Sequence, residues 1–424
     1  MEEDLYLAES KSPRFFYGYV VVLAAFLILA VVMGAAYSFG VFLKPLSAEF
    51  GWTRAAISGA FSLYMILHGF LYILAGKLND RFGPRIVMTV CGVLLGLGYL
   101  LMSQISTIWQ LYLVYGIIIG VAMSGGFVPL VSTVARWFVK RRGLMTGFVV
   151  SGVGAGGIIM PQVANWLISD FGWRYSYTII GVIALVLITV AAQFLRRDPG
   201  QVGQLPYGES GTGEGRLNVE AGGFSLREAI HNRQFWMFGA IFLCFGFSLQ
   251  VIMVHIVPHA IELGISAAVA ASILATIGGV SIAGRIMIGS AGDRVGNKSA
   301  AVFCLILMAL DLLWLLAAKE VWMLYLFAAI FGFAFGGFVV LMSPITAELF
   351  GLGSHGVIFG SIMLFSNTGE AIGPLLAGYI FDIAGSYNQA FLVCIAVSVI
   401  SAILSWLLTL VSSKGGTNDT RRST

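Results

Sequence analysis

The sequence predicts an all-α membrane protein in which twelve transmembrane helices form two related bundles of six. Three observations lead to this fold class: the composition, the number of long apolar stretches and a repeat at one constant offset. Of the 424 residues, 58% are hydrophobic and 10% are charged. Soluble domains carry about 25% charged residues, so the composition excludes an ordinary soluble protein.

Apolar stretches long enough to cross a hydrocarbon core of roughly 30 Å as a helix occur twelve times. Residues 197–231, between the sixth and seventh stretches, are rich in Gly, Glu and Arg and include the run GESGTGEGR. This composition predicts a flexible polar linker. The predicted spans are, in order, 17–43, 55–78, 84–104, 108–136, 143–168, 174–196, 232–260, 266–291, 297–317, 321–347, 355–380 and 387–411.

The predicted organisation follows from these stretches. Residues 1–196 form an N-terminal bundle, 197–231 a cytoplasmic central loop, 232–411 a C-terminal bundle and 412–424 a cytoplasmic tail. Lysines and arginines divide 19 to 4 between the two sides, and the larger number lies on the side of both termini. Because cytoplasmic loops carry an excess of these residues, both termini are predicted to be cytoplasmic. The chain before the first span lacks a basic region, so no removable signal peptide is expected.

A repeat at an offset of 213 residues relates the two predicted bundles. The residues from Gly76 to Arg85 align without a gap with those from Gly289 to Lys298. Two bundles of like topology, with a site between them at mid-membrane, are typical of secondary transporters. The same offset relates four further pairs, Gly143 and Gly356, Gly147 and Gly360, Pro161 and Pro374, and Gly172 and Gly385.

The two repeated loops carry the pattern Asp-Arg-x-Gly and resemble those between helices two and three of each half in the major facilitator superfamily. With the twelve spans and the central loop, the resemblance extends over nearly the whole chain. It implies that Asp80 and Asp293 accept hydrogen bonds at a helix terminus. It also implies that Arg81 and Arg294 bridge neighbouring helices, so that all four residues close the cytoplasmic side in one state. The alternative is that they are only cytoplasmic anchors.

The stretch RWFVKRRGLMTGFVVSGVGAGG, from Arg136 to Gly157, indicates a branch of this superfamily. It looks like the corresponding stretch of the monocarboxylate porters, and it is equally similar to that of the oxalate/formate exchangers. The seventh span, with the run HIVPHAIELGIS from His255, resembles that of bacterial monocarboxylate porters. These motifs indicate the branch but not the substrate.

Arg285 is a fixed cation inside an apolar span. It precedes Asp293 by two helical turns, about 12 Å, which places it near the middle of the membrane. A charge there is costly and usually faces a cavity or a partner, and a guanidinium matches a carboxylate bidentately. The resemblance implies that Arg285 is the substrate-binding arginine of both related families. The alternative is a packing arginine paired with Asp311 or Glu370. The equivalent position in the first half is Tyr72, which has no charge, so Arg285 is not part of the repeated scaffold.

Three positions differ from the pattern of those families. Oxalate exchangers carry a second cation in helix eleven, where this chain has Ser366. Animal monocarboxylate porters carry an acid one turn before the arginine and a lysine in helix one, where this chain has Ser281 and Tyr37. A dianion would therefore meet a single fixed charge, which favours a substrate with one carboxylate and leaves the proton route open.

Two residues are candidates to carry a coupled proton. His68 is equivalent to Ser281 in the repeat, and histidine titrates near neutrality; the alternative is a hydrogen bond between helices. Glu370 is an acid within the eleventh span and is a candidate for a proton site or a gate. With Arg285, the predicted substrate-binding residues are Tyr37, Ser281, Ser366 and Phe335, the last as part of the cavity wall.

His255 and His259 lie one helical turn apart near the outer end of the seventh span. No third metal ligand is near in sequence, so packing is favoured over a metal site, and an outer gate or proton entry is the alternative. Asp311, in the ninth span, is expected to be a structural partner of a polar neighbour.

These features predict a secondary active transporter, a proton-coupled symporter of small monocarboxylates such as lactate and pyruvate. The alternative within transport is an organic anion exchanger of the oxalate/formate type. A membrane sensor or an enzyme is not favoured, because the central loop is short and no nucleophile–base set appears. The predicted partners are a small carboxylate, a proton and the lipid bilayer. The protein is predicted to be a monomer in the inner membrane of a prokaryote, and no cofactor, metal or nucleic acid is expected.

Overall fold

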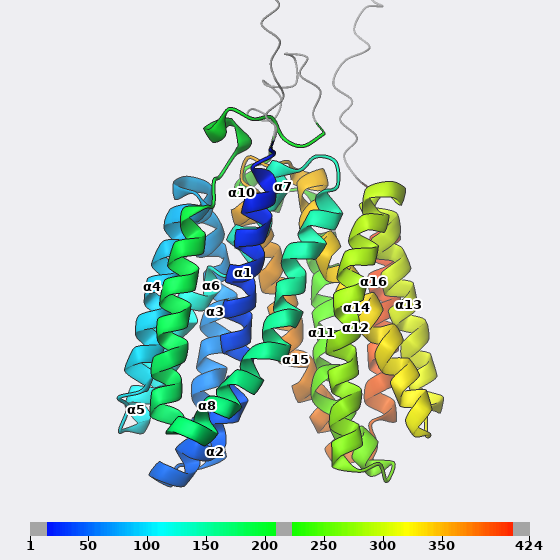
Figure 1. Ribbon diagram of the computed structural model, residues 1–424. Coiled ribbons are helices and arrows are strands. Elements are labelled where there is room, and N and C mark those ends of the chain that lie inside the picture. The colour runs from blue at the N-terminus through cyan, green and yellow to red at the C-terminus, as the bar shows by residue number, and fades with distance from the viewer. Residues whose placement is uncertain (1–14, 209–222, 410–424) are drawn as a thin grey trace, which may run out of the picture.

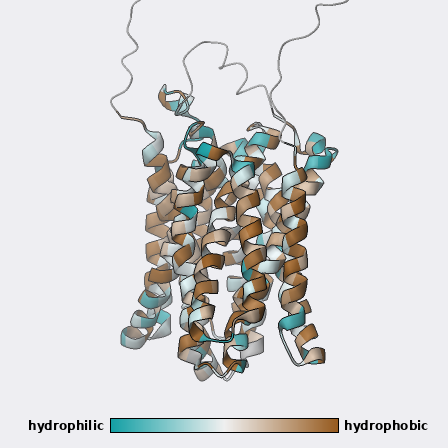
Figure 2. Cartoon of the chain, turned by 90° about the vertical axis from the view of Figure 1, so that its right-hand side faces the viewer, coloured by the Kyte–Doolittle hydropathy of each residue, from teal (hydrophilic) through white to brown (hydrophobic). Residues whose placement is uncertain are grey.

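The computed structural model describes residues 15–208 and 223–409, which are mainly α-helical (Figure 1). The acidic N-terminal residues, nearly all of the GESGTGEGR run and the predicted cytoplasmic tail lie outside the described residues. Hydrophobic residues cover the helices through their middle, and hydrophilic residues gather towards the two ends (Figure 2). This distribution is that of a chain whose helices cross a bilayer.

The first half of the chain forms one group of helices, in which the fourth apolar stretch is interrupted. A short α-helix, a π-helix and two further α-helices follow one another there. The elements are α1 (Gly18–Tyr37), α2 (Phe39–Phe50), α3 (Arg54–Phe82), α4 (Pro84–Met102), α5 (Ile108–Leu111), the π-helix η1 (Tyr112–Ile119), α6 (Gly120–Ser124), α7 (Val128–Trp137), α8 (Arg142–Gln193) and the 3-10 helix η2 (Pro199–Val202).

The second half forms another group, which lies beside the first in Figure 1. Its helices are α10 (Leu226–Ile230), α11 (Arg233–Glu262), α12 (Ala267–Val295), α13 (Asn297–Ala317), α14 (Val321–Phe350), α15 (His355–Ala384) and α16 (Asn388–Leu407). Apart from the five-residue α10, these helices are 20 to 30 residues long.

The structure confirms an all-α membrane fold, and each predicted span falls on one of these helices or series of helices. In the described chain, ten helical segments are long and apolar enough to cross a membrane. One of them, α8, covers two predicted spans and bends at Gly172, where φ is 80° and ψ is 163°. The 30-residue helix α15 is not among the ten. The count of twelve crossings therefore stays a prediction.

The 213-residue repeat reappears in how the helices begin and turn. Thr53 caps α3 by accepting a hydrogen bond from Ala56 N, and its counterpart Ser266 caps α12 by accepting one from Val269 N. Positive φ values occur at the paired glycines Gly83 and Gly296, and again at Gly172 and Gly385. Since this backbone region is open to glycine at little cost, the repeated glycines fix the same turns in both halves.

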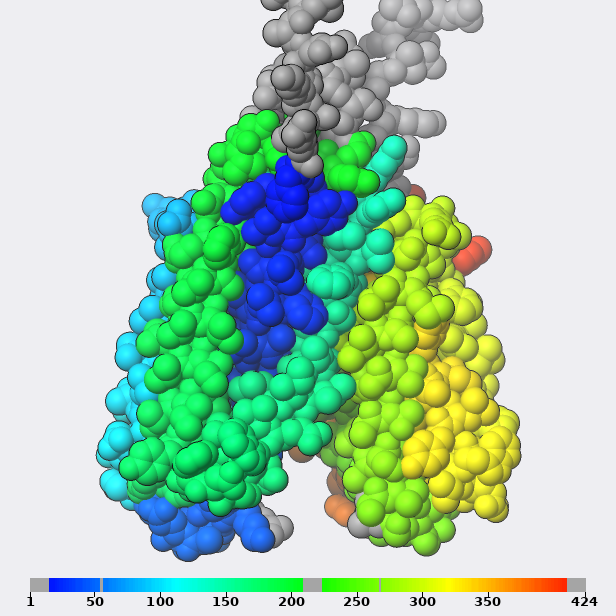
Figure 3. Space-filling model, in the orientation of Figure 1, coloured from blue at the N-terminus to red at the C-terminus, as the bar shows by residue number. Residues whose placement is uncertain are grey.

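The two halves meet where α3 packs against α15 and where α12 packs against α8. Glycines allow the backbones to touch: a Cβ atom on Gly76 would lie 2.1 Å from the carbonyl oxygen of Gly356, and one on Gly143 would lie 2.3 Å from that of Gly289. Small residues permit this close approach of membrane helices. Figure 3 shows the halves in contact towards the end that leads to the termini and separated by a hollow at the opposite end.

Both described ends of the central loop are docked, each on its own half. Tyr207 N donates to Trp137 O at 2.9 Å, and Tyr207 O accepts from Val139 N and Lys140 N. On the other half, Phe224 N donates to Phe350 O at 2.9 Å. The segment predicted as a flexible linker therefore begins and ends with residues that belong to the folded bundles.

Candidate functional site

A cavity of about 410 Å³ lies between the two halves. Helices from both halves line it, which is where a site of alternating access is expected. The lining residues are Met33, Ala36, Tyr37, Phe61, Tyr64, Met65, His68, Tyr72, Phe127, Val150, Val153, Phe245, Leu249, Gln250, Met253, Arg285, Phe335, Val339, Met342, Met363, Ser366, Asn367 and Glu370.

Arg285 of α12 is the fixed cation of this cavity. Its side chain is nearly buried, and Nη1 donates one hydrogen bond to Val150 O of α8 at 3.2 Å. Nε is buried and has no partner, and the ion pairs found in the described chain do not include Arg285. The packing pair with Asp311 or Glu370 is therefore not formed. A buried cation without an anion is costly unless a ligand supplies one.

Glycines on α8 make room for this arginine. A Cβ atom on Gly147 would lie 2.3 Å from the Arg285 carbonyl oxygen, and one on Gly154 would lie 3.2 Å from Nη1. One face of the guanidinium is covered by Phe335, whose ring centroid lies 5.7 Å from the guanidinium carbon. This geometry leaves the unpaired Nε and the remaining N–H groups as the donors for an anion.

Two polar side chains of α15 form a second feature of the cavity. Ser366 Oγ donates to Glu370 Oε1 at 2.9 Å, one helical turn away. Tyr37, at the end of α1, also lines the cavity and is 56% exposed. It packs against Gly157, whose added Cβ would lie 3.0 Å from the tyrosine ring. The predicted residues Tyr37, Ser366 and Glu370 are thus brought to one cavity with Arg285.

His68 is held between two tyrosines of its own helix, α3. The ring centroids of Tyr64 and Tyr72 lie 5.3 Å and 4.4 Å from that of His68. The imidazole is nearly buried, and its Nε2 has no hydrogen-bond partner. Tyr72, the counterpart of Arg285 in the repeat, also lines the cavity.

Ser281 is placed differently from the other predicted site residues. It is not part of the cavity lining; it is buried, and its hydroxyl donates to Gly278 O of the same helix at 2.7 Å. Its backbone packs against Gly336 of α14, where an added Cβ would lie 2.2 Å from the Ser281 carbonyl oxygen. The position one turn before Arg285 therefore contributes to helix packing in this state.

The repeated aspartates close the end of the molecule that leads to the termini. Asp80 of α3 accepts from Gly356 N at 3.2 Å and from Val357 N at 3.0 Å, at the start of α15. Asp293 of α12 accepts from Gly143 N at 2.7 Å and from Leu144 N at 2.8 Å, at the start of α8. Each carboxylate thus caps a helix of the opposite half, where the helix dipole also favours a negative charge.

The cations at this closed end are not those that the sequence indicated. Arg81 and Arg294 are exposed, and the hydrogen bonds and ion pairs of the described residues include neither. Arg136 of α7 takes the bridging role instead, since Nη2 donates to Leu352 O at 2.6 Å and lies 3.4 Å from Asp80. The sequence signal for Arg136 was its place in the branch motif, but the partners lie 56 and 216 residues away along the chain.

His355, the first residue of α15, was also missed. It is fully buried; Nδ1 lies 3.1 Å from Ser132 Oγ of α7, and Nε2 lies 3.1 Å from Ser343 O of α14. Because a carbonyl oxygen only accepts, Nε2 carries a proton. The imidazole therefore joins the two halves beside Asp80. Only its position, equivalent to Arg142 in the repeat, marked it in the sequence.

We expect the variant with Asp80→Asn and Asp293→Asn to open the closed end. Hydrogen bonds to a carboxylate are roughly twice as strong as neutral ones, so the two neutral amides should cost the closed end about 2 kcal/mol, roughly 30-fold in the equilibrium. Spin labels at the exposed positions Val139 and Val295 report the separation of the halves. A population at longer distance should appear, while Asp170→Asn, exposed, should change nothing. An unchanged distance distribution in the double variant would contradict the capping role.

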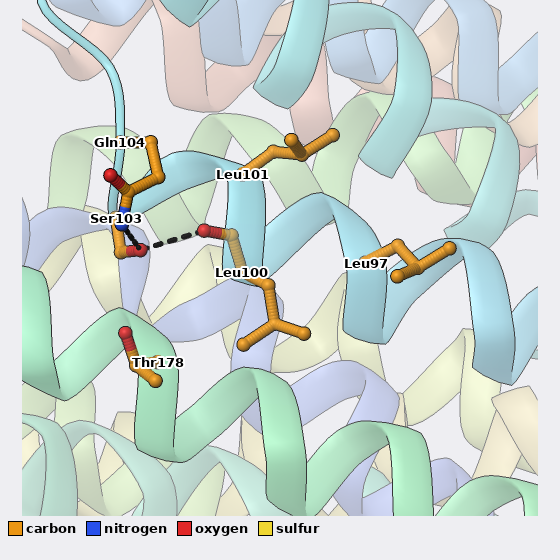
Figure 4. A pocket seen from close by; sticks show the side chains of 6 residues that line it. All are labelled: Leu97, Leu100, Leu101, Ser103, Gln104 and Thr178. Carbon is orange, nitrogen blue, oxygen red and sulfur yellow. Dashed lines mark hydrogen bonds between the residues drawn. The ribbon is translucent and has the colours of Figure 1, made fainter.

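A second recess lies on the outer surface where α4 approaches α8 (Figure 4). It is lined by Leu97, Leu100, Leu101, Ser103, Gln104 and Thr178. Ser103 Oγ already donates to Leu100 O at 2.7 Å and accepts from Gln104 Nε2 at 3.0 Å. Leu97 and Leu101 are about half exposed, at 46% and 47%, as lipid-facing residues are. None of the six lining side chains is charged, so this recess offers an anion nothing comparable to Arg285.

Comparison with known proteins agrees with the fold. The sequence profile of the Major Facilitator Superfamily matches residues 25–289 and 237–423 of this chain. Monocarboxylate transporter 13 of Bos taurus is 27% identical over 386 residues, which cover 91% of this chain and 87% of that protein. The oxalate:formate antiporter of Oxalobacter formigenes is 27% identical over 409 residues, 92% of this chain and 90% of that protein. The solved structure of the fucose:proton symporter FucP of E. coli has a TM-score of 0.70 at 16% identity, covering 94% of this chain and 100% of that one.

Proposed function

Because this chain belongs to the major facilitator superfamily, we propose that it carries small monocarboxylates, such as lactate and pyruvate, together with protons. A chain of this superfamily is a membrane transporter and not an enzyme. One observation carries the choice of substrate: Arg285 is a buried cation of the central cavity, and among the described residues no acid pairs with it. A carboxylate is the ligand that a guanidinium in such a place requires.

Binding of the substrate begins with the charge of Arg285. The carboxylate approaches through the hollow between the halves and accepts hydrogen bonds from Nε and a terminal N–H of the guanidinium. The ion pair neutralises the charge of Arg285, and this lowers the cost of closing the two halves around the substrate. Phe335 covers one face of the guanidinium and limits the directions from which an anion can reach it.

The coupled proton would bind to a titratable side chain of the cavity. Glu370 lines the cavity and shares a hydrogen bond with Ser366, while His68 offers an unpartnered Nε2. Glu370 is the one acidic side chain of the lining, so it is our first candidate for the proton site. The loaded site would then hold a neutral ion pair and a neutral carboxyl group, and the anion and the proton would cross together.

We propose that both termini are cytoplasmic, in the inner membrane of a prokaryote, because of the excess of lysines and arginines on their side. In that orientation the closed end is the cytoplasmic one, and the hollow opens to the outside. Loaded with substrate, the halves would rock about the fixed site until Asp80 and Asp293 release the starts of α15 and α8.

An organic anion exchanger is the second candidate, supported by the 27% identity to the oxalate:formate antiporter. Exchange of a dianion would call for a second cation in the cavity. At the position where the resemblance expects it, this chain has Ser366, which donates to an acid. Arg285 is the single Lys or Arg of the lining. A single carboxylate therefore matches the charge of the cavity better than two.

Purified protein in liposomes separates the two candidates. With the outside one pH unit more acidic, we expect labelled lactate to accumulate inside to about ten times its outside concentration at steady state. A tenfold proton gradient can sustain a tenfold gradient of a monoanion that is carried one to one with a proton. Liposomes loaded with unlabelled anion, without a pH gradient, test exchange. Uptake that ignores the pH gradient and needs internal anion would replace symport by exchange.

A further inference from the structure

The wall of the central cavity is much more apolar than a lactate-sized ligand requires. Besides one cation it offers eight side chains with a polar group, four of them aromatic, and the other fourteen lining residues are apolar. Lactate has a single methyl group to set against this wall. The methionines and phenylalanines of the lining are Met33, Phe61, Met65, Phe127, Phe245, Met253, Phe335, Met342 and Met363.

The aromatic part of this wall begins directly beside Arg285. Phe335 covers the guanidinium, with 5.7 Å between the ring centroid and the guanidinium carbon. Phe245 of α11 stacks next to Phe335, with ring centroids 6.4 Å apart and planes inclined by 25°. A carboxylate bound to Arg285 therefore places whatever is attached to it next to two aligned rings, which suits another ring or a branched chain.

A second aromatic surface belongs to the first half. Phe61 and Tyr64 of α3 both line the cavity, and their ring centroids lie 5.3 Å apart. Five methionines complete the lining from both halves. Methionine is unbranched and fits irregular or varied apolar surfaces. A volume of about 410 Å³ lies in the range of pockets that enclose ligands much larger than lactate, roughly 300–1,000 Å³.

We infer that the preferred substrates are monocarboxylates with a bulky apolar tail, a phenyl ring or a branched chain, one or two carbons from the carboxylate. The inference rests on the proposed function and narrows it. Arg285 holds the carboxylate. The tail lies with the rings of Phe335 and Phe245 on one side and the methionines on the other. When the halves close, the apolar wall loses its contact with water only if the tail fills the space.

A series with one head group tests this preference. Lactate, 2-hydroxy-4-methylpentanoate and 3-phenyllactate share the 2-hydroxycarboxylate and differ only in the tail. Each buried methylene raises affinity about fourfold, so we expect 3-phenyllactate to half-saturate proton-driven uptake at a concentration at least roughly 30-fold below that of lactate. The branched acid should lie between them. Equal or tighter half-saturation by lactate would overturn the inference.

A variant that fills the wall gives an independent measurement. Val339 of α14 lines the cavity and is partly exposed to it. Val339→Phe should raise the half-saturating concentration of 3-phenyllactate at least tenfold more than that of lactate. Val399→Phe is the matched control, because Val399 is 42% exposed on α16 and does not line the cavity. It should leave both values unchanged. An equal effect of Val339→Phe on both acids would contradict the placement of the tail.

The outcomes separate this inference from the proposed function. If proton-driven uptake occurs for lactate but not preferentially for the longer acids, the function stands and the preference is wrong. If none of the three acids is taken up, either with a pH gradient or by exchange, the proposed function itself fails. Preference for 3-phenyllactate that is lost in Val339→Phe supports both.

Discussion

Arg285→Ala is expected to abolish proton-driven uptake of monocarboxylates. Truncation of one member of a buried, hydrogen-bonded charge pair costs about 2–5 kcal/mol, which corresponds to a loss of at least roughly 30-fold in affinity. In this cavity the loss should be near the upper end, because Arg285 is the single fixed cation of the lining. Initial rates in proteoliposomes, over a range of substrate concentrations, measure the effect.

Arg285→Lys separates charge from geometry. Lysine keeps the positive charge but loses the planar fork that binds both carboxylate oxygens, so uptake should stay strongly impaired. Arg233→Lys, at the exposed start of α11, is the matched control and should transport normally. Full uptake by either Arg285 variant, with the protein folded as judged by a single symmetric peak in gel filtration, would move the carboxylate site elsewhere.

Glu370→Gln is expected to uncouple transport from protons. The amide keeps the size of the carboxyl group and can still accept from Ser366, but it cannot bind and release a proton. Accumulation driven by an acidic outside should therefore fall to the level seen without a gradient. Exchange of labelled for unlabelled substrate needs no net proton movement, and it should persist.

His68→Gln provides the comparison with the second candidate. If Glu370 carries the proton, this variant should keep its response to the pH gradient and change mainly in affinity. The opposite pattern would assign the proton to His68, and coupling that survives in both variants would exclude both residues. Together the two variants decide a question that the sequence left open.

The helices were predictable because they depend on local composition. A run of apolar residues defines a span wherever it lies, and the predicted span 297–317 coincides with α13. The turns were predictable for the same reason, since positive φ at Gly83 and Gly296 follows from glycine in a repeated loop. Arg285 could be singled out because a charge in such a span is unusual.

The contacts between the halves could not be predicted in this way. Asp80 finds its partners 276 and 277 residues away, at a helix start that no spacing in the sequence connects with it. Ser281 was expected at the site because the related families carry an acid at that position, one turn before Arg285. In the structure it is not part of the cavity lining, and its backbone packs against Gly336. Side-chain direction depends on the crossing of α12 and α14, which is a property of the assembled bundle.

The docked ends of the central loop have a consequence for the integrity of the chain. Tyr207 is fastened to the first half through Trp137, Val139 and Lys140, and Phe224 is fastened to the second half through Phe350. Each described end of the loop therefore belongs to the surface of its own bundle. A polypeptide divided between Tyr207 and Phe224 would give two fragments that each keep their anchor. We expect two such chains, made separately, to recognise each other through the glycine contacts of α3 with α15 and of α12 with α8.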